Sequence, residues 1–380
     1  MISGLMRRWF WFWFEPTPPA RLALSRALFY AGLLICYSRD DFSAWGGVSN
    51  EFWMPLPLFS ALRLFPLQPS ALDVLQAVWR IALALCSVGL FTRVSAIVAA
   101  VLGFYLLGLP HNFGQTFHVD ALLVIAMTIL AFSRAGDAYS IDALLARRAR
   151  HHRPAASGEY TWPIRMIWLA MSLVFLAAGI AKLRWGGLAW ITSDNMRIVL
   201  MRAVYHVSDA DPLTDAGLQI AASPWLTHVL AGSTVMIELA FIASLFHPVA
   251  RAVCVPAAFL LLVGIRALMG PRFAPFLVAN VFWVPWDVLA GYALRLLAWK
   301  RRTVPSLLES PTSLESPTSG TPLEHGWPTA SISTMPEDEH DASAEHRKDL
   351  DAPQKRVAKD FQLDISPLNR ATHAADFERH

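Results

Sequence analysis

The sequence predicts an all-α, polytopic membrane helix bundle, and three observations support this fold class. Hydrophobic residues make up 55% of the 380 residues and charged residues only 16%, whereas a soluble domain carries about 25% charged residues. Apolar runs close to the roughly twenty residues that cross a bilayer recur between residues 21 and 297. Tryptophan and phenylalanine number 15 and 22, and such aromatic side chains are enriched at membrane interfaces.

About eight transmembrane helices are expected, because prolines and charged residues separate the apolar runs. The expected spans are residues 21–37, 71–91, 94–109, 118–133, 163–182, 225–246, 248–268 and 273–297. The aromatic run at residues 9–14 is cut short by an acidic residue and several prolines. We therefore interpret it as an interfacial anchor and not as a signal peptide.

The composition changes after residue 302. Proline, serine, threonine and acidic residues dominate the remainder, and the pentapeptide ESPTS occurs at 309–313 and again at 315–319. A segment of this kind cannot bury enough apolar surface to order itself. The chain is thus expected to comprise a transmembrane bundle, 1–302, and a disordered polar tail, 303–380.

Basic residues indicate the orientation of the bundle. An even number of spans places both termini on one side of the membrane, and the basic loops fall on that side as well. These basic positions are Arg7, Arg8, Arg93, residues 147–153, Arg251 and residues 300–302. Because arginine and lysine accumulate in cytoplasmic loops, we expect a protein of the inner (cytoplasmic) membrane with both termini in the cytoplasm.

This topology predicts which polar residues share one depth. Lys182 lies nineteen residues after Pro163, about 28 Å along a helix and about one hydrocarbon thickness. The span that begins at residue 118 runs in the opposite direction, so its first residues lie at the same face. The residues expected at this extracytoplasmic depth are His118, Asp120, Lys182 and Arg266.

Two interpretations fit Lys182. A lysine held in apolar surroundings can lose its proton near neutral pH and act as a general base, with His118 as its assistant. Alternatively, Lys182 extends to the interface while His118 caps its helix. Arg266, Asp120 and Trp190 are candidate substrate-binding residues, since an arginine can bind an anion or a quinone oxygen and an indole can wall a flat ligand. Snorkelling of Arg266 and an interfacial belt that includes Trp190 are the alternatives.

Three further ionisable residues lie deeper in the predicted spans. Buried charges need partners, so we expect Glu238 and Arg80 to form a structural ion pair between two helices, with Arg26 assigned to the same structural class. Cys36, Cys86 and Cys254 stand alone. Because no clustered metal ligands, phosphate-binding glycine loop, nucleophile elbow or basic nucleic-acid patch occurs, neither a metal centre nor a nucleic-acid partner is expected.

Several segments resemble the HTTM domain, the membrane module of vitamin K-dependent gamma-carboxylase and its bacterial relatives. They are residues 18–26, the turn at 89–93 and the element at 136–142. The stretch 178–183, followed by Trp190, resembles the carboxylase segment with the catalytic lysine, which makes Lys182 the counterpart. His118, which precedes an apolar helix, resembles the histidine with an assisting role.

The resemblance implies a site that uses a reduced quinone (vitamin K-like) as cofactor. There the lysine deprotonates the hydroquinone, oxygen adds, and the strong base that forms removes a glutamate γ-proton of a secreted peptide for carboxylation. A non-catalytic HTTM protein that binds lipid or quinone, or assists the maturation or export of a partner peptide, is the alternative. A transporter is disfavoured because neither an inverted repeat nor paired broken helices occur.

Overall fold

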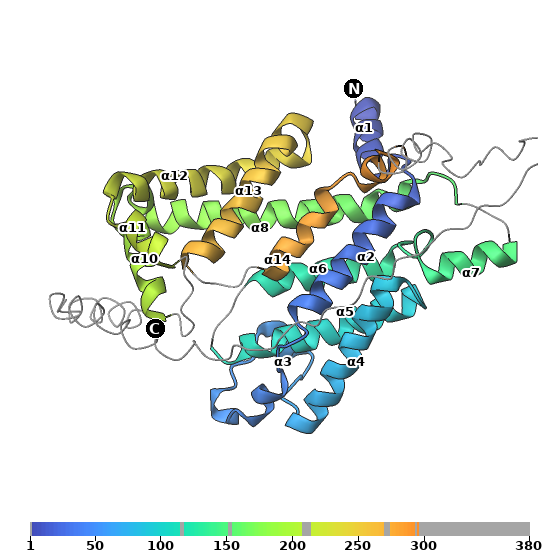
Figure 1. Cartoon of the computed structure of the whole chain (residues 1–380), viewed down its shortest axis with the longest axis horizontal. Coiled ribbons are helices and arrows are strands. Elements are labelled where there is room, and N and C mark those ends of the chain that lie inside the picture. Colours follow the sequence, from blue (N-terminus) through green and yellow to red (C-terminus); the bar gives the residue numbers. More distant parts are fainter. Residues whose placement is uncertain are drawn as a thin grey trace, which may run out of the picture. The chain divides into compact units, whose positions relative to one another are not determined.

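Helices form nearly all of the regular structure in the computed structural model (Figure 1). The structure describes residues 2–114, 118–150, 154–206, 214–269, 274–292 and 295. Within these ranges β-pairing is limited to one isolated bridge between Thr17 and Ser157. The chain divides into units 1–307 and 308–380, and all described residues belong to the first. The all-α prediction is confirmed, whereas the tail from residue 303 lies outside the described residues.

Six segments of the described chain are long and apolar enough to cross a membrane. Three of them are single helices: Pro19–Cys36 (α2), Pro69–Val88 (α4) and Pro248–Met269 (α13). The other three each combine an α-helix with a 3-10 helix. Thr92–Asn112 comprises α5 (Thr92–Gly108) and η3 (Leu109–Asn112), Gly158–Gly186 comprises η4 (Gly158–Tyr160) and α8 (Trp162–Gly186), and Pro224–Leu245 comprises α12 (Pro224–Ala240) and η5 (Phe241–Leu245). The apolar part of α6 (His118–Phe132), Asp120–Phe132, is shorter. The chain is therefore a multi-pass membrane protein.

Prolines set the starts of several spans. Pro19, Pro69, Pro163 and Pro224 occupy the first or second position of α2, α4, α8 and α12. The first turn of a helix tolerates proline because its N–H groups lack intrahelical acceptors. The predicted boundaries consequently lie within a few residues of the observed ones.

The last predicted span, 273–297, is interrupted. Ala274–Val278 (α14) continues as a 3-10 helix, Ala279–Trp283 (η6), and Val284 is extended with φ −77° and ψ 130°. Pro285 follows, and residues 286–292 are helical again. The prediction of one continuous helix is wrong here, because the residue before a proline is driven out of the helical region and proline itself lacks an N–H donor.

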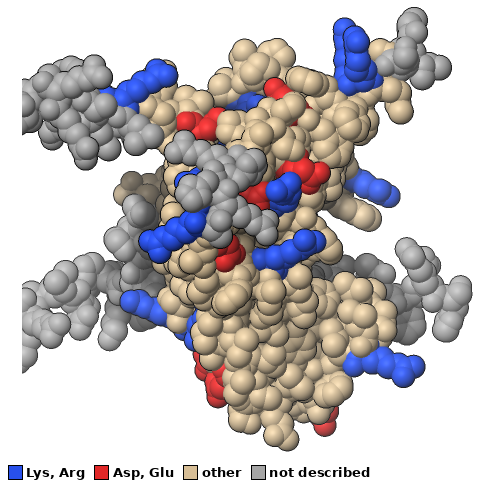
Figure 2. All heavy atoms as spheres, turned by 90° about the vertical axis from the view of Figure 1, so that its right-hand side faces the viewer, with Lys and Arg blue, Asp and Glu red and all other residues tan. Residues whose placement is uncertain are grey.

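Shorter helices precede the first span and occupy the loops between the spans. They are α1 (Ile2–Phe14), η1 (Ser43–Gly47), η2 (Asn50–Phe52), α3 (Pro57–Ala61), α7 (Ile141–Arg150), α9 (Ala189–Thr192), α10 (Asn195–His206) and α11 (Thr214–Ala221). Helix α1 contains the aromatic run expected as an interfacial anchor, and several of its aromatic rings are exposed. Figure 2 faces the end of the bundle near α1, α7 and the start of α8, where basic and acidic side chains are interspersed.

Small residues allow the central helices to pack closely. Helix α5 buries Ala96, Ala99 and Gly103. A Cβ atom added to Gly103 would lie 2.5 Å from Cε of Met127 and 3.1 Å from Nε1 of Trp79. Close approach of this kind increases the van der Waals packing that helps helices associate in membranes, where lipid removes the hydrophobic driving force.

Three segments that carry the family resemblance meet at one end of the bundle. The fully buried Arg26 donates to the Tyr139 carbonyl at 2.8 Å and to the Ser87 carbonyl at 3.5 Å. The Asp142 carboxylate, from the start of α7, accepts from the Thr92 backbone N–H at 2.7 Å and so caps the start of α5. Residues 18–26, 89–93 and 136–142 thus form one structural junction.

Candidate functional site

Lys182, near the end of α8, is bound to Glu238 on α12. Its Nζ lies 2.6 Å from Oε1 and 2.8 Å from Oε2 of the carboxylate. The expected partner of Glu238 was Arg80, and this prediction is wrong. The structure joins the two residues that the sequence placed in separate classes, one catalytic and one structural.

Gly179 allows α8 and α12 to approach at this point. It lies three residues before Lys182, and an added Cβ would lie 2.9 Å from Cδ2 of Leu239 and 3.2 Å from Cβ of Glu238. An alanine here would require the Leu239 side chain to move and the Cβ of Glu238 to shift by a few tenths of an ångström. The absence of a side chain at Gly179 therefore lets the two helices lie close enough for the Glu238 carboxylate to reach Lys182.

The pair is shielded from water to unequal extents. The Lys182 side chain is 24% exposed and that of Glu238 is 9% exposed. The ring of Trp190, on α9, has its centroid 5.4 Å from the ammonium, a distance at which the ring face attracts a cation. Charges inside apolar helices are tolerated when they are paired, and here the lysine has both a carboxylate and an aromatic face.

The sequence placed Lys182 at the extracytoplasmic face and Glu238 deeper in the membrane, but the structure places the two side chains at one depth. Counting along each helix gives Lys182 about 30 Å after Trp162 but Glu238 only about 21 Å after Pro224. Helix α8 has 25 residues, which span about 37 Å and exceed a hydrocarbon core of about 30 Å. Figure 1 shows α8 continuing past the end of α12. Counting from helix starts fails because the two helices are offset.

Arg80 and Arg26 use backbone carbonyls instead of carboxylates. Arg80 donates to the carbonyl of Tyr37 at 3.3 Å and also to the carbonyl of Asp40. Both carbonyls belong to the segment that directly follows the end of α2. Arg26 bonds to carbonyls at the junction described above. Both arginines therefore form structural hydrogen bonds to the backbone, and the predicted ion pair between Arg80 and Glu238 does not form.

Asp120 belongs to a second polar group. Its carboxylate accepts from the Tyr37 hydroxyl at 2.8 Å and contacts Nε2 of His111 at 2.9 Å. Burial and the adjacent Asp120 carboxylate raise the pKa of Tyr37. Sequence reasoning missed Tyr37, the last residue of the first predicted span, and His111, which lies just beyond the third, although both lie at the membrane face where Asp120 was expected.

The remaining predicted site residues are only partly placed. The backbone of His118 opens α6, but its side chain lies outside the described part of the structure. Arg266 occupies the last turn of α13 and is half-buried. Among the contacts of described residues, none joins Lys182 to Asp120. The structure therefore unites Lys182, Glu238 and Trp190, and separates them from the Asp120 group.

A family model of the HTTM domain matches residues 14–297. The chain belongs to the HTTM domain family. The matched residues include the Lys182–Glu238 pair, the Asp120 group and the junction at Arg26, so both polar groups are parts of the HTTM domain. No curated protein and no solved structure matches the chain.

Proposed function

We propose that this HTTM protein handles a membrane-soluble hydroquinone at the Lys182–Glu238 pair. The bidentate contact of the pair, at 2.6 and 2.8 Å, carries the proposal. The surrounding helices are apolar, and Lys182 keeps 24% of its side chain exposed. A small molecule in this site would meet a donor, an acceptor and the flat face of Trp190.

The pair suits deprotonation of a hydroquinone better than lysine alone. A hydroxyl group that gives its proton to Glu238 becomes an oxyanion, and the Lys182 ammonium then pairs with this oxyanion. One ion pair thereby replaces another, and no unpaired charge forms in apolar surroundings. In this scheme Glu238 accepts the proton and Lys182 stabilises the anion, while His118 stays the candidate assistant.

The resemblance to vitamin K-dependent carboxylases supports a quinol as the ligand. In that chemistry the deprotonated quinol takes up oxygen, and the strong base that forms serves to carboxylate glutamate in a peptide. For this chain we propose a reduced quinone as cofactor and a secreted peptide as the candidate substrate. Asp120 and Arg266 stay candidates for substrate contacts, with Asp120 already engaged by Tyr37 and His111.

Purified full-length protein in lipid nanodiscs, supplied with reduced vitamin K and oxygen, tests this function. We expect quinone epoxide to form with the wild type, and the single variants Lys182→Met and Glu238→Gln to yield none. The double variant Lys182→Met/Glu238→Leu is the folded control, since it removes both charges together. Unchanged epoxide yield in both single variants would exclude the pair from the chemistry.

A non-catalytic HTTM protein is the second candidate function. The specific observation in its favour is that Nζ of Lys182 already engages both carboxylate oxygens, as a strut between α8 and α12 would require. Such a protein would bind a quinone or lipid, or assist a partner peptide. Quenching of tryptophan fluorescence by reduced quinone, with no epoxide formed, would select this candidate.

We also propose the inner membrane as the location, with both termini cytoplasmic. This orientation is supported by Arg7, Arg8, Arg93 and Arg251, which fall on one side when α6 is counted as a span together with the six longer segments. A phosphatase or fluorescent reporter fused after Arg302 measures it. Cytoplasmic signal is expected, and periplasmic signal would reverse the orientation.

A further inference from the structure

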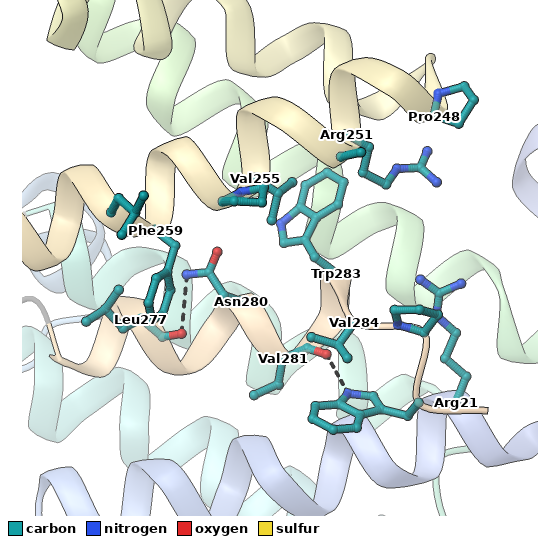
Figure 3. Close-up of a pocket in the computed structure, with 15 residues that line it drawn as sticks. Arg21, Pro248, Arg251, Val255, Phe259, Leu277, Asn280, Val281, Trp283 and Val284 are labelled. Atoms are coloured by element: carbon teal, nitrogen blue, oxygen red, sulfur yellow. Dashed lines mark hydrogen bonds between the residues drawn. The ribbon is translucent and has the colours of Figure 1, made fainter. Parts of the chain in front are cut away.

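A groove of about 810 Å³ lies between α13 and the interrupted segment 274–286 (Figure 3). Most of its wall is apolar. The principal apolar side chains are Val255, Phe259, Leu260, Leu277, Val281 and Val284. A volume of this size matches small-molecule and lipid sites, which run from about 300 to 1,000 Å³.

Two arginines occupy one end of this groove. Arg21 is the third residue of α2 and Arg251 is the fourth residue of α13. Figure 3 shows both guanidinium groups at the same end, with Phe259 and Leu277 toward the other. Both guanidinium groups face the ring of Trp168, at 5.2 Å for Arg21 and 4.2 Å for Arg251.

These guanidinium groups retain free hydrogen-bond donors. Arg251 donates through Nε to the Ser244 carbonyl at 3.0 Å and through Nη2 to the Leu245 carbonyl at 3.2 Å. The Nε of Arg21 is buried without a hydrogen-bond partner. Within the described residues, no carboxylate forms an ion pair with either arginine. Buried donors of this kind normally have a partner, so a ligand with acceptor oxygens would satisfy them.

The local charge favours an anion. Arg165 lies close enough to repel both Arg21 and Arg251, but it is paired with Glu15. Asp287 attracts Arg21 without reaching ion-pair contact. The three arginines and two carboxylates leave one net positive charge, which a neutral quinone would not compensate and a phosphate diester would.

We propose that this groove binds an anionic phospholipid, with the phosphate between Arg21 and Arg251 and an acyl chain along the apolar wall. Both arginines lie within the first four residues of spanning helices, where a lipid headgroup lies. Arginine is the side chain best suited to phosphate, because its planar fork donates two parallel hydrogen bonds. The groove then extends along α13, as an acyl chain would.

Lipid titration of the detergent-purified full chain, followed by native mass spectrometry, tests this site. Dioleoyl-phosphatidylglycerol is the anionic probe and dioleoyl-phosphatidylcholine the zwitterionic one. We expect the wild type to prefer phosphatidylglycerol, and Arg21→Gln/Arg251→Gln to bind it roughly tenfold more weakly, as loss of a charge-assisted hydrogen bond implies. Arg93→Gln, which removes an exposed arginine outside the groove, should keep the wild-type preference.

Two further variants protect the test against misfolding. Arg21→Gln alone removes no hydrogen bond made by the described residues and should still lower the preference. Leu260→Trp fills the groove from a side chain that is 67% exposed, and it should weaken both lipids equally. Equal binding of the two lipids by the wild type, unchanged affinity in the double arginine variant, or displacement of phosphatidylglycerol by reduced quinone would each overturn the proposal.

Discussion

Removal of Lys182 should destabilise the bundle more than neutralisation of Glu238, because the carboxylate is the more deeply buried partner. The Glu238 side chain is 9% exposed, and the Lys182 side chain is 24% exposed. Breaking a buried ion pair costs about 3–5 kcal/mol, since an unpaired charge stays behind. We expect Lys182→Met to cost about 3 kcal/mol, at the lower end because the pair is not fully dry. Glu238→Gln should cost about 1–2 kcal/mol, because the ammonium can extend toward water and still bonds the amide.

The double variant Lys182→Met/Glu238→Leu isolates the interaction. Replacing both charges by apolar groups is often neutral, so this protein should unfold within about 1 kcal/mol of the wild type. The assay is thermal unfolding of the purified protein in detergent, followed by tryptophan fluorescence. A cost of about 3 kcal/mol corresponds to a fall in Tm of about 4 °C in a chain of this size, at an unfolding entropy of about 2.1 cal/mol/K per residue. A Lys182→Met variant as stable as the wild type, or a double variant less stable than either single one, would show that the ion pair does not stabilise the bundle.

Two predictions concern the junction at the opposite end of the bundle. Burial alone would raise the pKa of Asp142, but hydrogen bonds from Thr92 outweigh it and hold that pKa below its ordinary value of 3.8. Asp142→Asn should therefore cost about 1–2 kcal/mol near pH 7, and a denaturant series should show the difference from the wild type shrinking as the pH falls below about 4. Gly89→Ala should cost more than about 2 kcal/mol of unfolding free energy in the same series, because φ is 73° and the new Cβ would collide with Cβ of Ser140. Gly47→Ala is the control, because there is open space around Gly47. Its unfolding free energy should stay within about 0.5 kcal/mol of the wild-type value. Equal losses in the two glycine variants, or a pH-independent loss in Asp142→Asn, would contradict these explanations.

The spans could be predicted from sequence because each one is defined by its own residues. A run of apolar side chains must leave water wherever it lies, and the prolines at positions 19, 69 and 224 begin helices for local reasons. Pro285 was equally visible, and the rule that restricts the residue before a proline would have identified the break in the last span.

The partner of Lys182 could not be predicted in the same way. Pairing depends on how far α8 and α12 are shifted along each other. It also depends on the close approach of the two helices at Gly179. Neither quantity is a property of one helix. The hydrogen bond between His111 and Asp120 likewise depends on the path of the chain between α5 and α6. That path cannot be predicted from the spacing of apolar residues.

Epoxide formation by Glu238→Gln decides whether the Glu238 carboxylate accepts the hydroquinone proton. This variant keeps the size of the side chain and its hydrogen bond to Lys182, but it removes the carboxylate proposed to accept the hydroquinone proton. We predict epoxide from the wild type, none from Glu238→Gln, and a folded Glu238→Gln protein in both fluorescence and size-exclusion measurements. Wild-type epoxide yield in Glu238→Gln would contradict this prediction.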